Sequence, residues 1–260
     1  MLESGDPNPS EVEKLVHSDP ALTAGLLKTS SAASFGRQRP VTTVREAIMV
    51  LGFRSIRSIA IALWTQALVR EGKHNSKLDL ERFSKSSFFT GYLASEIYAC
   101  STLPKSAERW TAEEVFAMGV LSRLGVGLLS LLAPEEFDLC YESAKSSASD
   151  VQTTFQEKHG RPLVQLSAIA AEAMGLPVGL VAALKSMATG EGSEAVVEAC
   201  SYVELATKVA DANGMGVGRW DIPFDPASAD INGFDPSTFD LENAILRAKN
   251  ATNGPMLKSA

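Results

Sequence analysis

Histidine is scarce in this chain, which has three among its 260 residues: His17, His74 and His159. No two of them share a face of a predicted helix. Imidazole is the commonest metal ligand in proteins and a frequent general base, so the scarcity leaves little material for a metal centre or a histidine-based mechanism. We interpret each histidine as a surface or helix-end residue.

Cysteine is equally rare. Cys100, Cys140 and Cys200 lie far apart and form no CxxC pair, which is typical of a reducing compartment and argues against a disulfide framework. We expect Cys100 and Cys140 to pack as small apolar residues. The N-terminal stretch MLESGDPNPS is acidic and polar, unlike a signal peptide, so the expected location is the cytoplasm.

Basic and aromatic residues are both in short supply. The chain carries 24 lysines and arginines against 31 acidic residues, a net charge of −7, which argues against general nucleic-acid binding. Aromatic residues make up 7 % of the chain, and no segment alternates at the period of two that marks a strand. The apolar content of 45 % is enough for one large core or two smaller lobes. The sequence therefore predicts an all-α fold of two packed helical lobes, without a significant sheet.

What the chain does contain is a series of helix start and stop signals. Prolines and capping residues begin many of the apolar segments, and glycines end them. Gly52 is predicted to end one helix in the left-handed conformation. The predicted helices span about 10–17, 44–51, 55–69, 80–100, 111–132, 150–159, 162–174, 177–189, 193–212 and 236–251, with others beginning at Pro20 and Pro134.

The most apolar stretch is Thr111–Leu132. It opens with Thr111 and Glu114, which have the spacing of a capping box, and after them its only charge is Arg123. Its length approaches that of a membrane span, but a central arginine, three glycines and two serines indicate a buried core helix instead. We therefore place this helix at the centre of the fold. Ser122 and Arg123 would face the position where a catalytic site would lie if the protein has one.

Several short motifs, taken in order, resemble the HDOD family. The later segments FAMGVLSRLGVGLL and IAAEAMGLPVGLVAAL fit its pattern, and the resemblance covers roughly residues 11–218. It implies the all-helical fold of the HD phosphohydrolases, which are metal enzymes acting on phosphate esters of nucleotides. The N-terminal motifs are Asp19-Pro20, Ser31-Ala32, Ala47-Ile48 and Leu51-Gly52, with Ser30 where asparagine is usual.

The resemblance also identifies the positions that hold the metal in HD phosphohydrolases. There a histidine, a His-Asp pair and a later aspartate bind it, because imidazole and carboxylate are ligands for divalent cations. None of the residues at these positions in this chain is a good ligand, and two are cations, so the resemblance implies a pseudo-enzyme without metal or cofactor. The matched residues are Lys85 at the first histidine, Ser122 and Arg123 at the pair, Thr207 at the last aspartate, and Ser186 and Met187 at a further pair that is often His-His.

Two interpretations of Arg123 stay open. In the first it is a core arginine paired with a carboxylate, because burying it unpaired would cost several kcal/mol. In the second Lys85 and Arg123 together contact an anion such as a nucleotide phosphate, which the forked guanidinium suits.

A local basic stretch lies on this acidic chain between Lys28 and Arg57, with Glu46 as its single acid. It is either a solvated face or a docking patch for an acidic protein or a nucleic acid, and the lack of interleaved aromatic residues favours a protein. No membrane contact is expected. The patch would consist of Arg37, Arg39, Arg54 and Arg57.

The expected organisation is one HDOD-like domain followed by an extension. Residues 1–75 would form the N-terminal lobe, residues 76–218 the HD-like lobe, and residues 219–260 an acidic extension that folds back and carries a terminal helix. The resemblance implies a non-catalytic bacterial signalling module that works by binding partner proteins. The alternatives are a nucleotide-binding sensor without chemistry and a residual phosphohydrolase.

Overall fold

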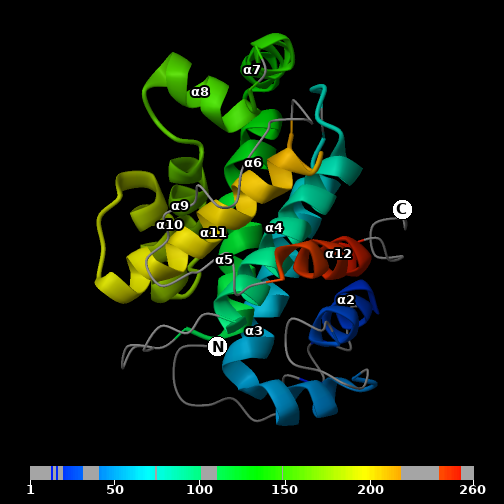
Figure 1. Ribbon diagram of the computed structural model, residues 1–260. Coiled ribbons are helices and arrows are strands. Elements are labelled where there is room, and N and C mark those ends of the chain that lie inside the picture. The colour runs from blue at the N-terminus through cyan, green and yellow to red at the C-terminus, as the bar shows by residue number, and fades with distance from the viewer. Residues whose placement is uncertain are drawn as a thin grey trace.

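The computed structural model describes residues 13, 16, 20–31, 41–73, 75–100, 110–147, 149–217 and 240–252. These residues form helices and turns without a β-sheet, which confirms the all-α prediction (Figure 1). The helices are α2 (Pro20–Ser30), α3 (Val44–Glu71), α4 (Leu80–Cys100), α5 (Ala112–Ser122), α6 (Leu124–Leu132), α7 (Pro134–Ser147), α8 (Val151–His159), α9 (Val164–Ala173), α10 (Val178–Thr189), α11 (Glu194–Ala212) and α12 (Leu241–Thr252). Apart from residues 13 and 16, the helix expected at 10–17 lies outside the described residues.

Helix α3 has a kink where the sequence predicted a helix end. Thr43 caps its start by accepting a hydrogen bond from the Glu46 N–H, as expected. Gly52 has φ 79° and ψ 164°, a conformation open essentially to glycine alone. The sequence predicted the positive φ of Gly52 but not its extended ψ. Because of this conformation the chain bends at Gly52, and it then resumes as a helix.

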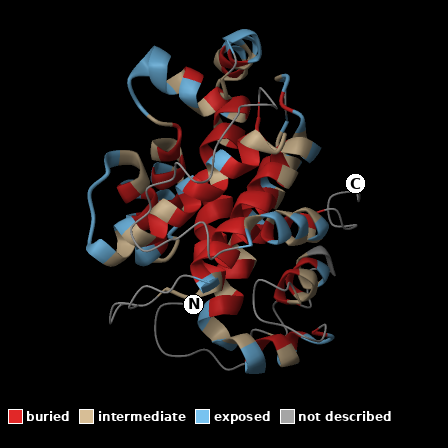
Figure 2. Ribbon diagram, in the orientation of Figure 1, coloured by how far each residue is buried: buried red, intermediate tan, exposed pale blue. Residues whose placement is uncertain are grey.

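Helices α4 and α5 cross closely at the centre of the molecule, where Figure 2 shows the densest burial. A Cβ placed on Gly119 would lie 2.7 Å from the Gly91 Cα, and one placed on Gly91 would lie 2.8 Å from the Phe116 carbonyl oxygen. Two glycines therefore let the two backbones touch. Around this contact the rings of Phe88 and Tyr92 pack against Phe116.

The central apolar segment is two helices, and the single helix predicted over 111–132 is wrong. Helix α5 ends at Ser122, Arg123 has φ −85° and ψ −9°, and α6 begins at Leu124. The Gly125 N–H donates to the Ser167 side chain of α9 at 2.7 Å instead of continuing the ladder of α5. A tertiary hydrogen bond thus replaces a helical one at the break, and no local signal in the sequence marks it.

Two segments are long and apolar enough, by length and composition, to cross a membrane: Val44–Glu71 and Ala112–Leu132. In the second, 83 % of the most apolar window is buried inside the protein. That burial is what a core helix requires, because its apolar surface is covered by neighbouring helices.

Helix α12, the helix that the structure describes within the predicted C-terminal extension, packs against α4 (Figure 1). Arg247 donates to both carboxylate oxygens of the buried Glu96, with the shortest contact at 2.7 Å. Leu246 is exposed. The packing of α12 therefore depends on this ion pair as well as on its small apolar residues Ala244 and Ala248.

Candidate functional site

A buried ion pair lies at the position where the sequence was matched to the HD metal site. The Arg123 Nη2 donates to the Asp211 Oδ1 at 3.1 Å, and the two side chains are 1 % and 9 % exposed. Arg123 occupies the break between α5 and α6, whereas Asp211 lies in the last turn of α11. This is the arrangement that the core interpretation of Arg123 requires, with Asp211 as its carboxylate.

The electrostatics of the pair are set by burial. Removal from water raises the pKa of Asp211, and the Arg123 guanidinium opposes that rise. Arginine keeps its charge at any ordinary pH, so the Asp211 carboxylate is the counter-charge that makes its burial tolerable. The Arg123 Nε has no hydrogen-bond partner among the described residues, so any loss of Asp211 would leave the guanidinium further unsatisfied.

A cavity of about 270 Å³ adjoins the pair. Ser122 and Thr207 both line it together with Asp211, so the structure brings these two predicted positions together. Lys85 is not among the lining residues; it pairs with Glu81 one turn earlier on α4, at 2.7 Å. In the structure each of the two cations is paired with its own carboxylate, Lys85 with Glu81 and Arg123 with Asp211.

Asp211 is the partner of Arg123 that the sequence analysis did not identify. The matching placed the last HD aspartate at Thr207, which is one helical turn before Asp211 on the same face of α11. The available signal was a carboxylate at the i+4 position, since residues four apart lie on one side of a helix.

A larger cavity, of about 690 Å³, lies between α3, α5, α10 and α11. Arg54 and Arg57 of the predicted docking patch line it, beside Trp110, whereas Arg37 and Arg39 lie outside the described residues. Arg54 pairs with the Glu114 carboxylate. The Arg57 Nε is buried and has no partner among the residues that the structure describes. First-turn residues of α10 and α11, whose N-termini carry no side-chain cap, complete the lining.

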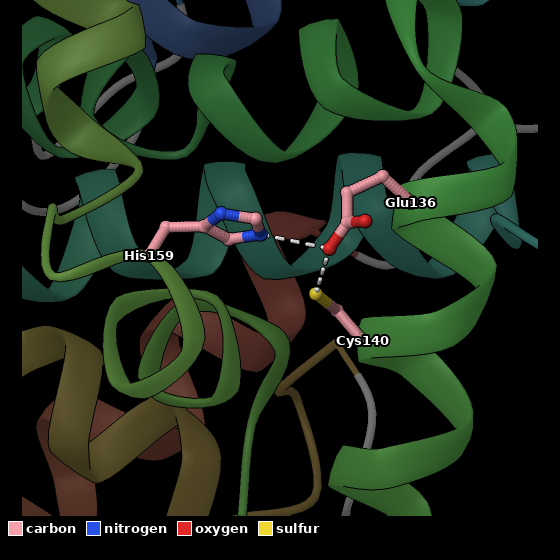
Figure 3. A group of neighbouring side chains, drawn as sticks. All are labelled: Glu136, Cys140 and His159. Atoms are coloured by element: carbon pink, nitrogen blue, oxygen red, sulfur yellow. Dashed lines mark hydrogen bonds and ion pairs between the residues drawn. The ribbon is translucent and has the colours of Figure 1, made fainter.

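Three side chains with metal-ligating atoms converge between α7 and α8 (Figure 3). The Glu136 Oε1 lies 2.8 Å from the His159 Nε2 and accepts from the Cys140 thiol at 3.5 Å and from the Lys158 ammonium at 2.7 Å. The hydrogen bonds from Lys158 and His159 lower the pKa of Glu136 to about 2. Burial, with a smaller contribution from Glu136, raises the pKa of Cys140 to about 11.

The sequence alone does not predict that these residues lie together. His159 is the last residue of α8 and half-exposed, as the helix-end interpretation predicted, and Cys140 is buried. What it missed is that α8 folds back on α7 and brings His159 to a Glu-x-x-x-Cys pair. The four-residue spacing of Glu136 and Cys140 was the available signal, because it places both on one side of a helix.

The structure combines an all-helical, HD-like fold with a buried Arg123–Asp211 ion pair at its centre. The family model for the HDOD domain matches residues 1–188. The chain therefore belongs to the HDOD family, as its motifs suggested.

Solved structures give the same fold. An HDOD domain protein of unknown function from Geobacter sulfurreducens has a TM-score of 0.72 at 16 % identity, over 97 % of this chain and 88 % of that one. A protein from Marinobacter aquaeolei VT8, provisionally named for signal transduction, gives 0.68 at 19 % identity over 98 % and 56 %. One from Shewanella amazonensis SB2B, provisionally named a phosphohydrolase, gives 0.65 at 20 % identity over 98 % and 88 %. No curated protein matches the sequence.

Proposed function

We propose that the chain is a non-catalytic HDOD regulatory module that acts by binding a partner protein. The observation that supports this most directly is the Arg123–Asp211 pair. The guanidinium at this matched position is bound to the Asp211 carboxylate and is nearly inaccessible to solvent.

The size of the electrostatic barrier supports the same conclusion. A divalent cation about 4 Å from the guanidinium would be repelled by roughly 8 kcal/mol at an effective dielectric constant of about 20. The guanidinium cannot release its proton to relieve this repulsion. Without a metal, the cleft has neither a metal-bound hydroxide nor a clamp for phosphate.

A panel of phosphate mono- and diesters, with Mg²⁺, Mn²⁺ or Fe²⁺ supplied, tests the absence of catalysis. We expect no turnover above a heat-denatured blank. Turnover that is reproducible in the wild type and lost in Asp211→Asn would overturn the proposal in favour of a residual phosphohydrolase.

For partner binding we propose the cavity that Arg54 and Arg57 line, with an acidic segment of the partner as its occupant. A positive cavity wall on a chain of net charge −7 attracts an acidic segment locally and repels acidic surfaces elsewhere. Arg57 is the better contact, because Arg54 already pairs with Glu114.

Charge reversal tests this docking site. We expect Arg57→Glu to lose a partner that the wild type captures from native lysate, in quantitative mass spectrometry. The matched control is Arg45→Glu, which changes an exposed arginine of the same helix that pairs with Glu13 and should retain that partner. Equal capture by both variants, with unchanged melting temperatures, would remove the cavity as the docking site.

A nucleotide-binding sensor is the second candidate, and the same cavity favours it. Its volume lies in the range of small-molecule sites, and Trp110 lines it together with Arg57, so an aromatic ring and a guanidinium are both available to a ligand. Calorimetric titration with a panel of nucleotides distinguishes the two. Binding of one nucleotide that Arg57→Ala abolishes would favour the sensor.

A further inference from the structure

The Glu136–Cys140–His159 cluster lies between α7 and α8, and its residues are distinct from those of the Arg123–Asp211 pair. Its carboxylate, thiol and imidazole atoms all lie within 4.8 Å of one another (Figure 3). We propose that these three residues form a binding site for Zn²⁺, with a fourth coordination position left to water. None of these three residues was matched to the metal position of the HD phosphohydrolases.

The spacing of the ligand atoms is close to what zinc requires. Zinc bonds of about 2.0–2.3 Å in a tetrahedral arrangement place two ligand atoms roughly 3.4–3.8 Å apart. The Glu136 Oε1 lies 3.5 Å from the Cys140 Sγ and 2.8 Å from the His159 Nε2. The Cys140 Sγ and the His159 Nε2 are at most 4.8 Å apart, so movements of about 1 Å, which rotation of side chains can supply, bring the three atoms to these separations.

Helices rather than loops position the ligands. Glu136 and Cys140 are one turn apart on α7, whose neighbouring Phe137 is fully buried. Helix α8 is fixed at its start by the Asp150 side chain and at its end by Gly160 in the left-handed conformation. The His159 ring packs on Phe155 with a centroid distance of 4.4 Å. Ligands held by rigid elements lose little freedom when a metal binds.

The chemistry of the ligands selects zinc or cobalt over magnesium or calcium, because thiolate and imidazole are ligands for softer cations. On binding, the Cys140 S–H bond is exchanged for a metal–sulfur bond and the proton passes to solvent. The thiolate and the Glu136 carboxylate then neutralise the two charges of the metal.

Lys158 is the competitor for this site. It donates to the Glu136 oxygen that the metal would use, at 2.7 Å, but its side chain is 45 % exposed and that of Glu136 is 26 % exposed. Such an exposed pair contributes about 0–1 kcal/mol, so a metal bound to a thiolate displaces it. The lysine then swings into water, whereas Arg123 has no such exit.

Cobalt titration of the full chain, first stripped of metal with a chelator, tests the site. We expect a thiolate-to-cobalt absorption band that saturates at one Co²⁺ per chain and disappears when Zn²⁺ is added. Cys140→Ser should abolish the band, and Cys200→Ser, which changes a second buried thiol, should retain it. No band in the wild type, or a band that persists in Cys140→Ser, overturns the proposal.

Two further variants separate metal binding from a structural role and do not remove a buried side chain. Glu136→Gln should weaken Co²⁺ binding at least tenfold, because the amide carries no charge. Lys158→Met should tighten it by up to about fivefold, since it removes the competitor. A structural ion pair predicts no gain in affinity from Lys158→Met, and unchanged or weaker binding in that variant would refute the role assigned to Lys158.

Discussion

The two carboxylates at Asp211 and Glu136 each hold a cationic side chain, and they differ in how firmly. Arg123 on Asp211 is 1 % exposed, whereas Lys158 on Glu136 is 45 % exposed. A buried partner cannot leave without exposing an uncompensated charge to the interior, whereas an exposed partner can move into water at little cost. Burial, rather than the presence of a carboxylate, decides which site can accept a metal.

Among the substitutions that test this difference between the two ion pairs, the largest expected effect is a loss of stability on removing Arg123. Arg123→Leu leaves the Asp211 carboxylate buried without a counter-charge, so we expect a loss of about 3–5 kcal/mol in the free energy of unfolding, measured by urea denaturation. The matched change in the exposed pair, Lys158→Met, should cost less than about 1 kcal/mol.

A double variant sharpens the same comparison. Arg123→Leu combined with Asp211→Leu removes both charges, and we expect it to recover most of the loss, because apolar replacement of a complete buried pair is often neutral. Equal destabilisation by Arg123→Leu and Lys158→Met would contradict the view that the two pairs differ in kind.

A second effect comes from the close packing of α6 against the start of α9, two residues after Arg123. A Cβ on Gly125 would overlap the Leu163 carbonyl of the adjoining segment, and backbone cannot yield as a side chain does. We expect Gly125→Ala to lower the free energy of unfolding by about 1–3 kcal/mol, measured by thermal unfolding. Gly179→Ala, whose Cβ would meet only the Trp110 ring at 3.2 Å, is the control and should be close to neutral.

The smallest effect is a pH dependence of the exposed pair in metal-free protein. The pKa of Glu136 is lowered from 4.5 to about 2 by Lys158 and His159, so its ionised form stabilises the folded state above pH 4.5. That contribution is lost as the pH falls toward 2, because the folded state then binds a proton that the unfolded state already carries.

For so exposed a pair we expect this contribution to be about 1 kcal/mol or less. It is the difference in unfolding free energy between wild type and Glu136→Gln, which should shrink between pH 5 and pH 2. A difference that stays constant over this range would show that the carboxylate charge contributes nothing.

Local signals in the sequence were enough to predict most helix ends. The capping box of Thr111 and Glu114 is present, Asp150 caps α8, and Gly160 and Gly190 end their helices in the left-handed conformation. Each of these features depends on atoms within one turn of chain, so composition and spacing reveal it.

Features that depend on distant chain segments were not predictable. The helix break at Arg123 rests on a hydrogen bond to Ser167, and the counter-charge of Arg123 comes from Asp211 on another helix. The pairing of Lys85 with Glu81, by contrast, is local, because residues four apart lie on one side of a helix. Glu136 and His159 are brought together only by the turn between α7 and α8.

The position of Asp211 has a practical consequence for work on isolated fragments. The family match ends at residue 188, and a chain truncated there would lack α11 altogether. Such a fragment would keep Arg123 in its interior with no anion to balance it, and would lose the helix that covers α4. We expect such a fragment to aggregate. That aggregation would result from the truncation and would say nothing about the intact protein.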